Sequence, residues 1–155
     1  MMDINEMLNI DLIDVNLRAE TKEELFELVG KDLEVKGFVN KNYTEGIKKR
    51  EKEFPIGLIT KNLNIALPHS ETEYVEKPFI YIVKLQNSPL TFNQMGDNQE
   101  MEVSDFFFLG IKDPSKQVQL LSYLMDLFSD DNFINDYKNT TEKEKIYELI
   151  NTYKK

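Results

Sequence analysis

The chain of 155 residues contains no cysteine, no tryptophan and a single histidine, His69. The lack of cysteine excludes disulfides and thiolate metal sites, and it fits a reducing cytosol. With one histidine, a zinc site would need several carboxylates. The acids nearest to His69 are Glu71, Glu73 and Glu76, and such acids are more often solvated loop residues than ligands. We therefore expect no metal and no cofactor.

The sequence also lacks long apolar runs and any excess of basic residues. Its longest apolar runs, such as residues 106–109, are too short to span a bilayer. Residues 1–6 show neither basic residues nor the long apolar stretch of a targeting segment, so we expect a cytoplasmic protein without membrane insertion. The formal net charge is −9, from 28 acidic and 19 basic residues. Such a surface repels nucleic acid and favours a basic protein partner, although charge also simply confers solubility.

Helical patterns are interspersed with apolar runs along the chain. Thr21 and Glu24 form a capping box for a helix that ends near Gly37. Asn40 or Asn42 begins a second helix, which ends before Pro55. Further helices are expected after 113–115, at about 132–138, and from the Thr141/Glu144 capping box to about 152. The core-facing residues are expected to be Leu25, Leu28, Val29 and Leu33 in the first helix and Val118, Leu121, Leu124, Met125 and Phe128 in the long one.

Strands are expected at about 63–67, 79–86 and 103–111, after a weaker one at 10–15. The 79–86 and 103–111 runs are rich in aromatic and branched residues, which indicates strands covered on both faces. Residues 87–89 and 95–98 are expected to be turns. The predicted fold class is α/β, with a mixed β-sheet flanked by helices on both faces, in one domain spanning 1–155.

His69 follows the apolar run 63–67 and Pro68. Proline cannot donate to a strand ladder, so we expect strand pairing to stop at Pro68 and the imidazole to stand exposed at the end of a sheet. A neutral imidazole is a good nucleophile toward phosphorus near pH 7. A surface histidine without a chemical role is the alternative interpretation.

Two segments carry a resemblance to a known family. Residues 50–58 read Arg-Glu-Lys-Glu-Phe-Pro-Ile-Gly-Leu, and residues 64–70 read Asn-Ile-Ala-Leu-Pro-His-Ser. Together they resemble the enzyme IIA domain of bacterial sugar phosphotransferase systems, of the fructose/mannitol superfamily. That family shows an arginine, a proline–threonine–glycine turn and a strand that ends in isoleucine–alanine–x–proline–histidine. The resemblance extends through 78–109 to the leucine-rich helix around 120–121, and it implies the mannitol-type enzyme IIA fold.

The resemblance also implies an activity and partners. His69 would accept a phosphoryl group from phospho-HPr and pass it to a cysteine or histidine of an enzyme IIB component, through which the protein would meet the membrane component IIC. Arg50 would be the active-site arginine, because phosphoryl transfer depends on positioning and charge stabilisation. The residues expected to support the phosphoryl site are Ser70, Gln117 and Gly57. The residues expected to form the partner interface are Phe54, Ile56 and Glu71.

Two positions depart from the family pattern. Ile56 stands where the family usually has threonine, which removes a hydroxyl group. Gln117 stands where mannitol-type members carry a second histidine, and this resembles the galactitol-like branch. Gln117 and Ser70 are also consistent with a helix-start residue and a turn residue. Gly57 would supply a positive φ or let the backbone approach closely, and an ordinary tight turn is its alternative. The functional alternatives are a nitrogen-type regulatory module, whose phosphorylation state other proteins read, and a scaffold that carries no phosphate.

Overall fold

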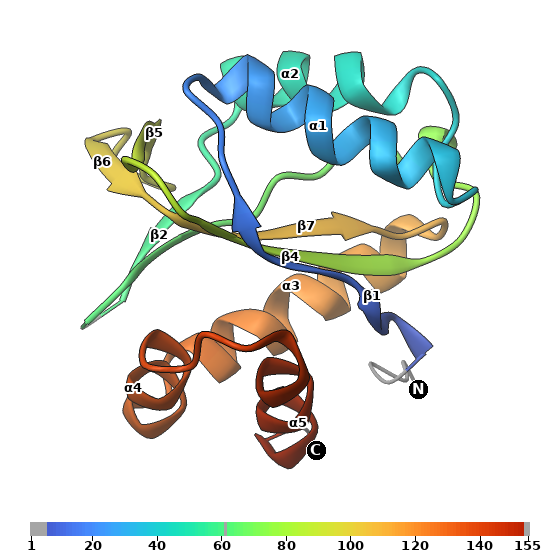
Figure 1. Cartoon of the computed structure of the whole chain (residues 1–155). Coiled ribbons are helices and arrows are strands. Elements are labelled where there is room, and N and C mark those ends of the chain that lie inside the picture. Colours follow the sequence, from blue (N-terminus) through green and yellow to red (C-terminus); the bar gives the residue numbers. More distant parts are fainter. Residues whose placement is uncertain (1–5, 61, 154–155) are drawn as a thin grey trace.

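The fold is described from a computed structural model, which describes residues 6–60 and 62–153. Residues 1–5, on which the expectation of no targeting segment largely rests, lie outside the described residues. Within the described ranges, a five-stranded sheet has the order β1-β4-β7-β3-β2 (Figure 1). Its strands are β1 (Leu8–Leu17), β4 (Phe79–Leu85), β7 (Asp105–Gly110), β3 (Asn64–Ala66) and β2 (Gly57–Ile59).

The sheet is mixed, as predicted. β1 runs parallel to β4 and β3 runs parallel to β7. β4 and β7 are antiparallel, and so are β2 and β3. A separate antiparallel pair is formed by β5 (Leu90–Asn93) and β6 (Glu100–Val103).

Helices cover both faces of the sheet (Figure 1). One face is covered by α1 (Lys22–Val35) and α2 (Tyr43–Glu53). The other is covered by α3 (Pro114–Phe128), α4 (Asp131–Lys138) and α5 (Lys143–Tyr153). A short 3₁₀ turn, η2 (Thr72–Tyr74), follows His69. The predicted fold class is confirmed.

No helix in residues 6–60 and 62–153 is long and apolar enough to cross a membrane.

The first helix begins and ends with the expected signals. The Thr21 hydroxyl accepts the Glu24 N–H, while the Glu24 carboxylate accepts the N–H of Glu20 rather than that of Thr21. Gly37 has φ +85°, and the N–H of the next residue, Phe38, donates to Leu33, which is the Schellman arrangement. The expectation that Leu28 faces the core is wrong, because its side chain is 44% exposed.

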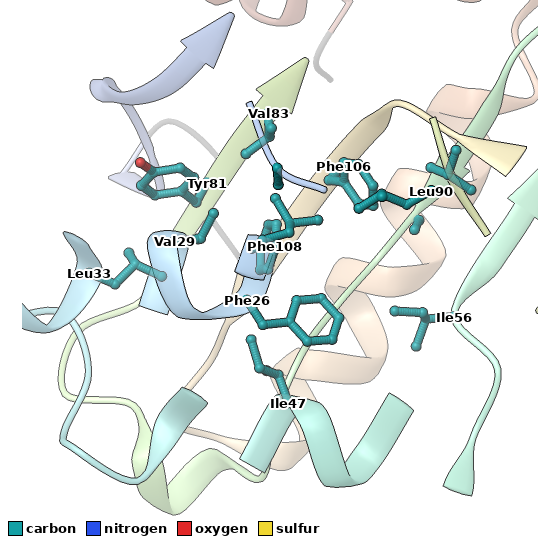
Figure 2. Close-up of a cluster of buried hydrophobic side chains, with 14 of the residues drawn as sticks. Phe26, Val29, Leu33, Ile47, Ile56, Tyr81, Val83, Leu90, Phe106 and Phe108 are labelled. Atoms are coloured by element: carbon teal, nitrogen blue, oxygen red, sulfur yellow. The ribbon is translucent and has the colours of Figure 1, made fainter. Parts of the chain in front are cut away.

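Each face of the sheet has its own apolar core. Under α1 and α2, the rings of Phe26 and Phe108 meet edge-to-face at 5.9 Å (Figure 2). The rings of Phe92 and Phe106 meet edge-to-face at 5.4 Å. Burying one such ring contributes about 1.5–3 kcal/mol. The central strand β7 is buried along its whole length, which agrees with a strand covered on both faces.

The expected core stripe of the long helix is wrong in part. Val118 is 69% exposed and Met125 is 41% exposed. The residues that α3 buries are Leu120, Leu124, Leu127 and Phe128. The sequence of α3 contains two adjacent apolar stripes, and only packing against the sheet decides which of them is covered.

Several boundaries also differ from the prediction. The expected strand at 103–111 is divided at Ser104 between β6 and β7. The short strands β2 and β5 were not predicted, because three or four residues show no periodicity. The closing helix begins at Lys143, so Thr141 lies one residue before the N-cap position.

Candidate active site

His69 stays paired to the sheet beyond Pro68. The Leu109 N–H of β7 donates to the Pro68 carbonyl at 2.9 Å, and His69 forms an isolated parallel bridge with Leu109. The expectation that pairing stops at Pro68 is therefore wrong. Proline lacks only the donor, and its carbonyl remains free to accept. The Leu67 N–H also donates to the Ile56 carbonyl, so the backbone before His69 is held from both sides.

The imidazole of His69 is largely buried rather than exposed. The residue is 7% exposed and its neighbour Ser70 is 2% exposed. Because the backbone remains against β7, the ring is held within the end of the sheet instead of projecting from it. A protein that donates a phosphoryl group would therefore have to reach the small accessible part of a ring whose position is already fixed.

A backbone contact fixes the tautomer of His69. Nδ1 lies 2.8 Å from the Leu67 carbonyl oxygen. A carbonyl only accepts, so in this contact Nδ1 carries the hydrogen and the neutral ring has its lone pair on Nε2. Burial lowers the pKa of His69 below its ordinary 6.5, and the Arg50 charge lowers it further. The Leu67 hydrogen bond and Glu71 oppose this shift. The ring is therefore neutral and nucleophilic at neutral pH.

The structure brings Arg50 close to His69, although nineteen positions separate them in the sequence. Arg50 lies in the last turn of α2, and its charge acts on the His69 pKa. Its Nη1 lies 3.0 Å from a Glu71 carboxylate oxygen, and its guanidinium carbon lies 5.2 Å from the centre of the Phe54 ring. Its Nε is buried and has no hydrogen-bond partner among the described residues. A buried N–H of this kind is costly unless a ligand oxygen satisfies it.

Gly46 is a site residue that the motif does not include. A Cβ at this position of α2 would lie 2.8 Å from the Tyr74 ring and 3.3 Å from Ser70 Cβ. The missing side chain therefore lets α2 approach the segment that follows His69. The signal in the sequence was a glycine inside a helix, where it costs about 1 kcal/mol relative to alanine.

Tyr43 is a second missed residue. Its buried hydroxyl donates to the Leu109 carbonyl at 3.4 Å. Leu109 is also the residue that bridges His69. One position of β7 therefore contacts both α2 and the His69 segment.

The three predicted support residues lie in different surroundings. The Ser70 hydroxyl donates to the Glu71 carbonyl at 2.9 Å. Gly57 does not have a positive φ, and a Cβ there would collide with Met101 Sδ, so it permits a close approach of chains. Gln117 is partly exposed in the first turn of α3. Within the described part of the chain, no hydrogen bond joins Gln117 to His69 or Arg50.

The predicted interface residues divide between surface and core. Phe54 is 54% exposed and the Glu71 side chain is 62% exposed. The prediction that Ile56 belongs to a partner interface is wrong, because Ile56 is 2% exposed. Its side chain lies among the buried apolar residues of Figure 2, and an apolar branched side chain suits that environment better than a hydroxyl would.

Over the described ranges, no group of three or more His, Cys, Asp or Glu residues is placed to hold a metal ion. His69, Arg50 and the residues around them combine a nucleophile with a positive charge and an unsatisfied donor.

The chain is similar to known proteins in sequence and in fold. The model of the family described as "Phosphoenolpyruvate-dependent sugar phosphotransferase system, EIIA 2" matches residues 6–153. The galactitol-specific EIIA component of Escherichia coli (strain K12) is 29% identical over 103 residues, which are 66% of this chain and 68% of that protein.

Two solved structures share the fold. The nitrogen regulatory protein IIA-Ntr of Neisseria meningitidis matches with a TM-score of 0.76 and 22% identity, over 94% of this chain and 97% of its own. The complex of mannitol enzyme IIA with phosphorylated enzyme IIB from Escherichia coli contains a chain that matches with a TM-score of 0.76 and 20% identity, over 94% of this chain and 99% of its own.

Proposed function

Because this chain belongs to the EIIA 2 family of the phosphoenolpyruvate-dependent sugar phosphotransferase system, we propose that it carries a phosphoryl group on His69 between two proteins. The donor is phospho-HPr and the acceptor is an enzyme IIB component. The observation that carries the proposal is the Nδ1 contact with Leu67, which leaves Nε2 as the nucleophile beside Arg50.

Acceptance begins with the neutral ring. The Nε2 lone pair attacks the phosphorus of phospho-HPr, and a new P–N bond forms while the bond to the donor imidazole breaks. The electron pair of that bond returns to the donor nitrogen. Protonation of the other nitrogen of the donor lets it leave as a neutral imidazole. The Arg50 guanidinium, with its unpartnered Nε–H, offsets the charge on the equatorial oxygens.

Delivery uses the same hydrogen bond. After transfer, the His69 ring carries a phosphoryl group on Nε2 and a hydrogen on Nδ1, which the Leu67 carbonyl holds. A ring that keeps this hydrogen leaves as neutral imidazole when the acceptor attacks phosphorus. The buried backbone contact therefore keeps the phosphorylated ring a competent leaving group, as a reversible carrier requires.

Other residues complete the proposed site. Ser70 offers its hydroxyl to a phosphoryl oxygen once it turns from the Glu71 carbonyl. Gln117 offers a neutral amide donor from the start of α3, and Gly57 supports the site through close backbone packing. Phe54 and Glu71 form the rim that a partner protein meets. One domain spanning 1–155 performs these steps in the cytoplasm.

Similarity to one relative supports a particular transport partner. The 29% identity to a galactitol-specific component, together with Gln117 in place of a histidine, supports a galactitol-type IIB cysteine as the acceptor. The fold alone does not distinguish transport from nitrogen-type regulation, because a mannitol-type and a nitrogen-type structure both match with a TM-score of 0.76. Transfer to a purified IIB protein distinguishes them, since a purely regulatory module does not need that step.

The test is phosphorylation with phosphoenolpyruvate, enzyme I and HPr, followed by intact-mass measurement. The expected result is a gain of one phosphoryl group that is labile in acid and stable in base. His69→Ala removes the only imidazole and should abolish the gain, while its circular dichroism spectrum confirms that it still folds. Full phosphorylation of His69→Ala would overturn the assignment.

A further inference from the structure

Glu71 places a negative charge at a site that is proposed to hold a phosphoryl group. Its carboxylate lies 3.0 Å from Arg50 Nη1, and its charge acts on His69. A carboxylate repels a phosphoryl dianion, so this residue type opposes binding unless it does something else for the site. Its contact with Arg50 is the feature of the structure that offers such a role.

The guanidinium group of Arg50 is held by one edge and left open on another. Nη1 donates to Glu71, and the guanidinium carbon lies 5.2 Å from the centre of the Phe54 ring. The opposite edge is formed by Nε and Nη2, whose N–H bonds run side by side and match two oxygens of a phosphoryl group. Nε on this edge is buried and has no partner in the described part of the chain.

An arginine side chain loses considerable rotamer entropy when it is fixed in one position. Arg50 is partly accessible, with 27% of its side chain exposed, so burial alone does not fix it. A contact with Nη1 constrains the rotation of the guanidinium and leaves the Nε/Nη2 edge free. Gly46 and Ser70 bring the segment that carries Glu71 against α2, which keeps this contact within reach.

We propose that Glu71 is a positioning residue, whose carboxylate holds Nη1 of Arg50 so that the Nε/Nη2 edge faces the phosphoryl group on His69. The proposal rests on the proposed function and adds a role for Glu71 beyond the partner rim. It requires Glu71 to affect the transfer rate at neutral pH through Arg50, because the pKa of His69 is lowered and its ring is already neutral there. A glutamine, whose amide oxygen also accepts from Nη1, should replace it in large part.

The experiment measures phosphorylation of the full chain from phospho-HPr by rapid quench, which gives a rate at saturating donor and a KM. Glu71→Ala should lower the saturated rate about 10-fold with little change in KM. Glu71→Gln should retain the rate within about 3-fold. In an Arg50→Ala background, adding Glu71→Ala should change the residual rate by less than 2-fold, because no guanidinium remains to be positioned. Glu73→Ala is the matched control, since Glu73 is an exposed acid two residues further on in η2.

A second measurement does not depend on transfer. The Arg50 Nε–H signal in ¹⁵N NMR spectra should exchange with water faster in Glu71→Ala than in the parent chain or in Glu71→Gln. The proposal would be overturned if Glu71→Ala lowered the rate equally with and without Arg50. It would also be overturned by an effect confined to KM and shared by Glu73→Ala, because Glu71 would then act only as a charge on the partner rim. Failure of the parent chain to be phosphorylated on His69 would instead overturn the proposed function, while the NMR comparison would still decide the position of Arg50.

Discussion

The pKa of His69 is set by opposing influences on its ring. Burial is the largest, and with the Arg50 charge it lowers the pKa below 6.5, while the Leu67 hydrogen bond and Glu71 act in the opposite direction. In the proposed mechanism the neutral ring is the nucleophile, so the rate at which the chain accepts a phosphoryl group should stay constant as the pH falls to 6.5 and decrease only at lower pH. Because His69 is the only histidine, its imidazole resonance titrates without overlap in NMR spectra.

Arg50→Ala should raise the pKa of His69, and it should slow phosphoryl transfer through a loss of about 2–4 kcal/mol of transition-state stabilisation.

The lowered pKa of His69 also predicts how the stability of the fold depends on pH. Below pH 6.5 the unfolded chain binds a proton on this imidazole more readily than the folded chain does. Unfolding is therefore favoured as the pH falls from 6.5 through the lowered folded-state pKa. A titration midpoint at or above 6.5 in the native protein would contradict this account of the site, and His69→Gln is the control for the acid dependence of the melting temperature.

At the residue scale, the sequence predicted His69 and Arg50 because a motif spaces them. It did not predict the contact of Arg50 with Glu71 or the burial of the His69 ring. Both depend on how closely α2 approaches the segment after β3, and local sequence pattern does not encode that distance. Ile56 was misplaced for a related reason, since a position next to the motif does not reveal whether its side chain faces a partner or the core.

At the scale of elements, two glycines allow a matched comparison. Gly46→Ala adds a methyl group that collides with the Tyr74 ring and crowds Ser70. The clash should outweigh the gain of about 1 kcal/mol in helix propensity, with a net loss of about 1 kcal/mol in unfolding free energy. Because the displaced segment carries His69 and Glu71, the rate of phosphoryl transfer should also fall.

Gly37→Ala is the control. Gly37 has φ +85° and open space around its Cα, so alanine there costs about 1–2 kcal/mol of backbone strain without a collision. Its transfer rate should remain that of the parent chain when both are measured well below their melting temperatures. Gly46→Ala could likewise lower stability while leaving the rate of phosphoryl transfer at that of the parent chain. In that case the close approach of α2 would not be what positions the site.

The elements themselves were predictable to different degrees. Capping residues predicted α1 well, because Thr21 and Gly37 act within a few residues of the backbone groups they satisfy. The buried face of α3 was predicted only in part, since Val118 and Met125 continue an apolar pattern that the sheet does not cover. The strands β2 and β5 exist because neighbouring strands pair with them, and that information lies elsewhere in the chain.

At the scale of the whole molecule, partner choice follows from charge and from the residues around a buried histidine. The net charge of −9 favours a basic docking surface on both donor and acceptor. The chain should pass its phosphoryl group faster to a galactitol-type IIB cysteine than to a mannitol-type one.

Gln117→Ala should slow either transfer by about 1 kcal/mol, the value of one hydrogen bond in a wet site. Rapid-quench transfer from the phosphorylated chain to each purified IIB domain measures both effects.

Ionic strength distinguishes docking from chemistry in this comparison. If opposite charge steers the encounter, added salt should raise the KM for each IIB protein and leave the saturated rate unchanged, because the Debye length shortens to about 3 Å at 1 M salt. The preference between the two IIB proteins should persist at high salt to the extent that contacts with exposed residues such as Phe54 determine it. Equal rates to the two partners at every salt concentration, or faster transfer to the mannitol-type domain, would reject the galactitol-type assignment. His69 would still be the carrier in that case, because acceptance from phospho-HPr is measured separately and does not depend on which IIB protein follows.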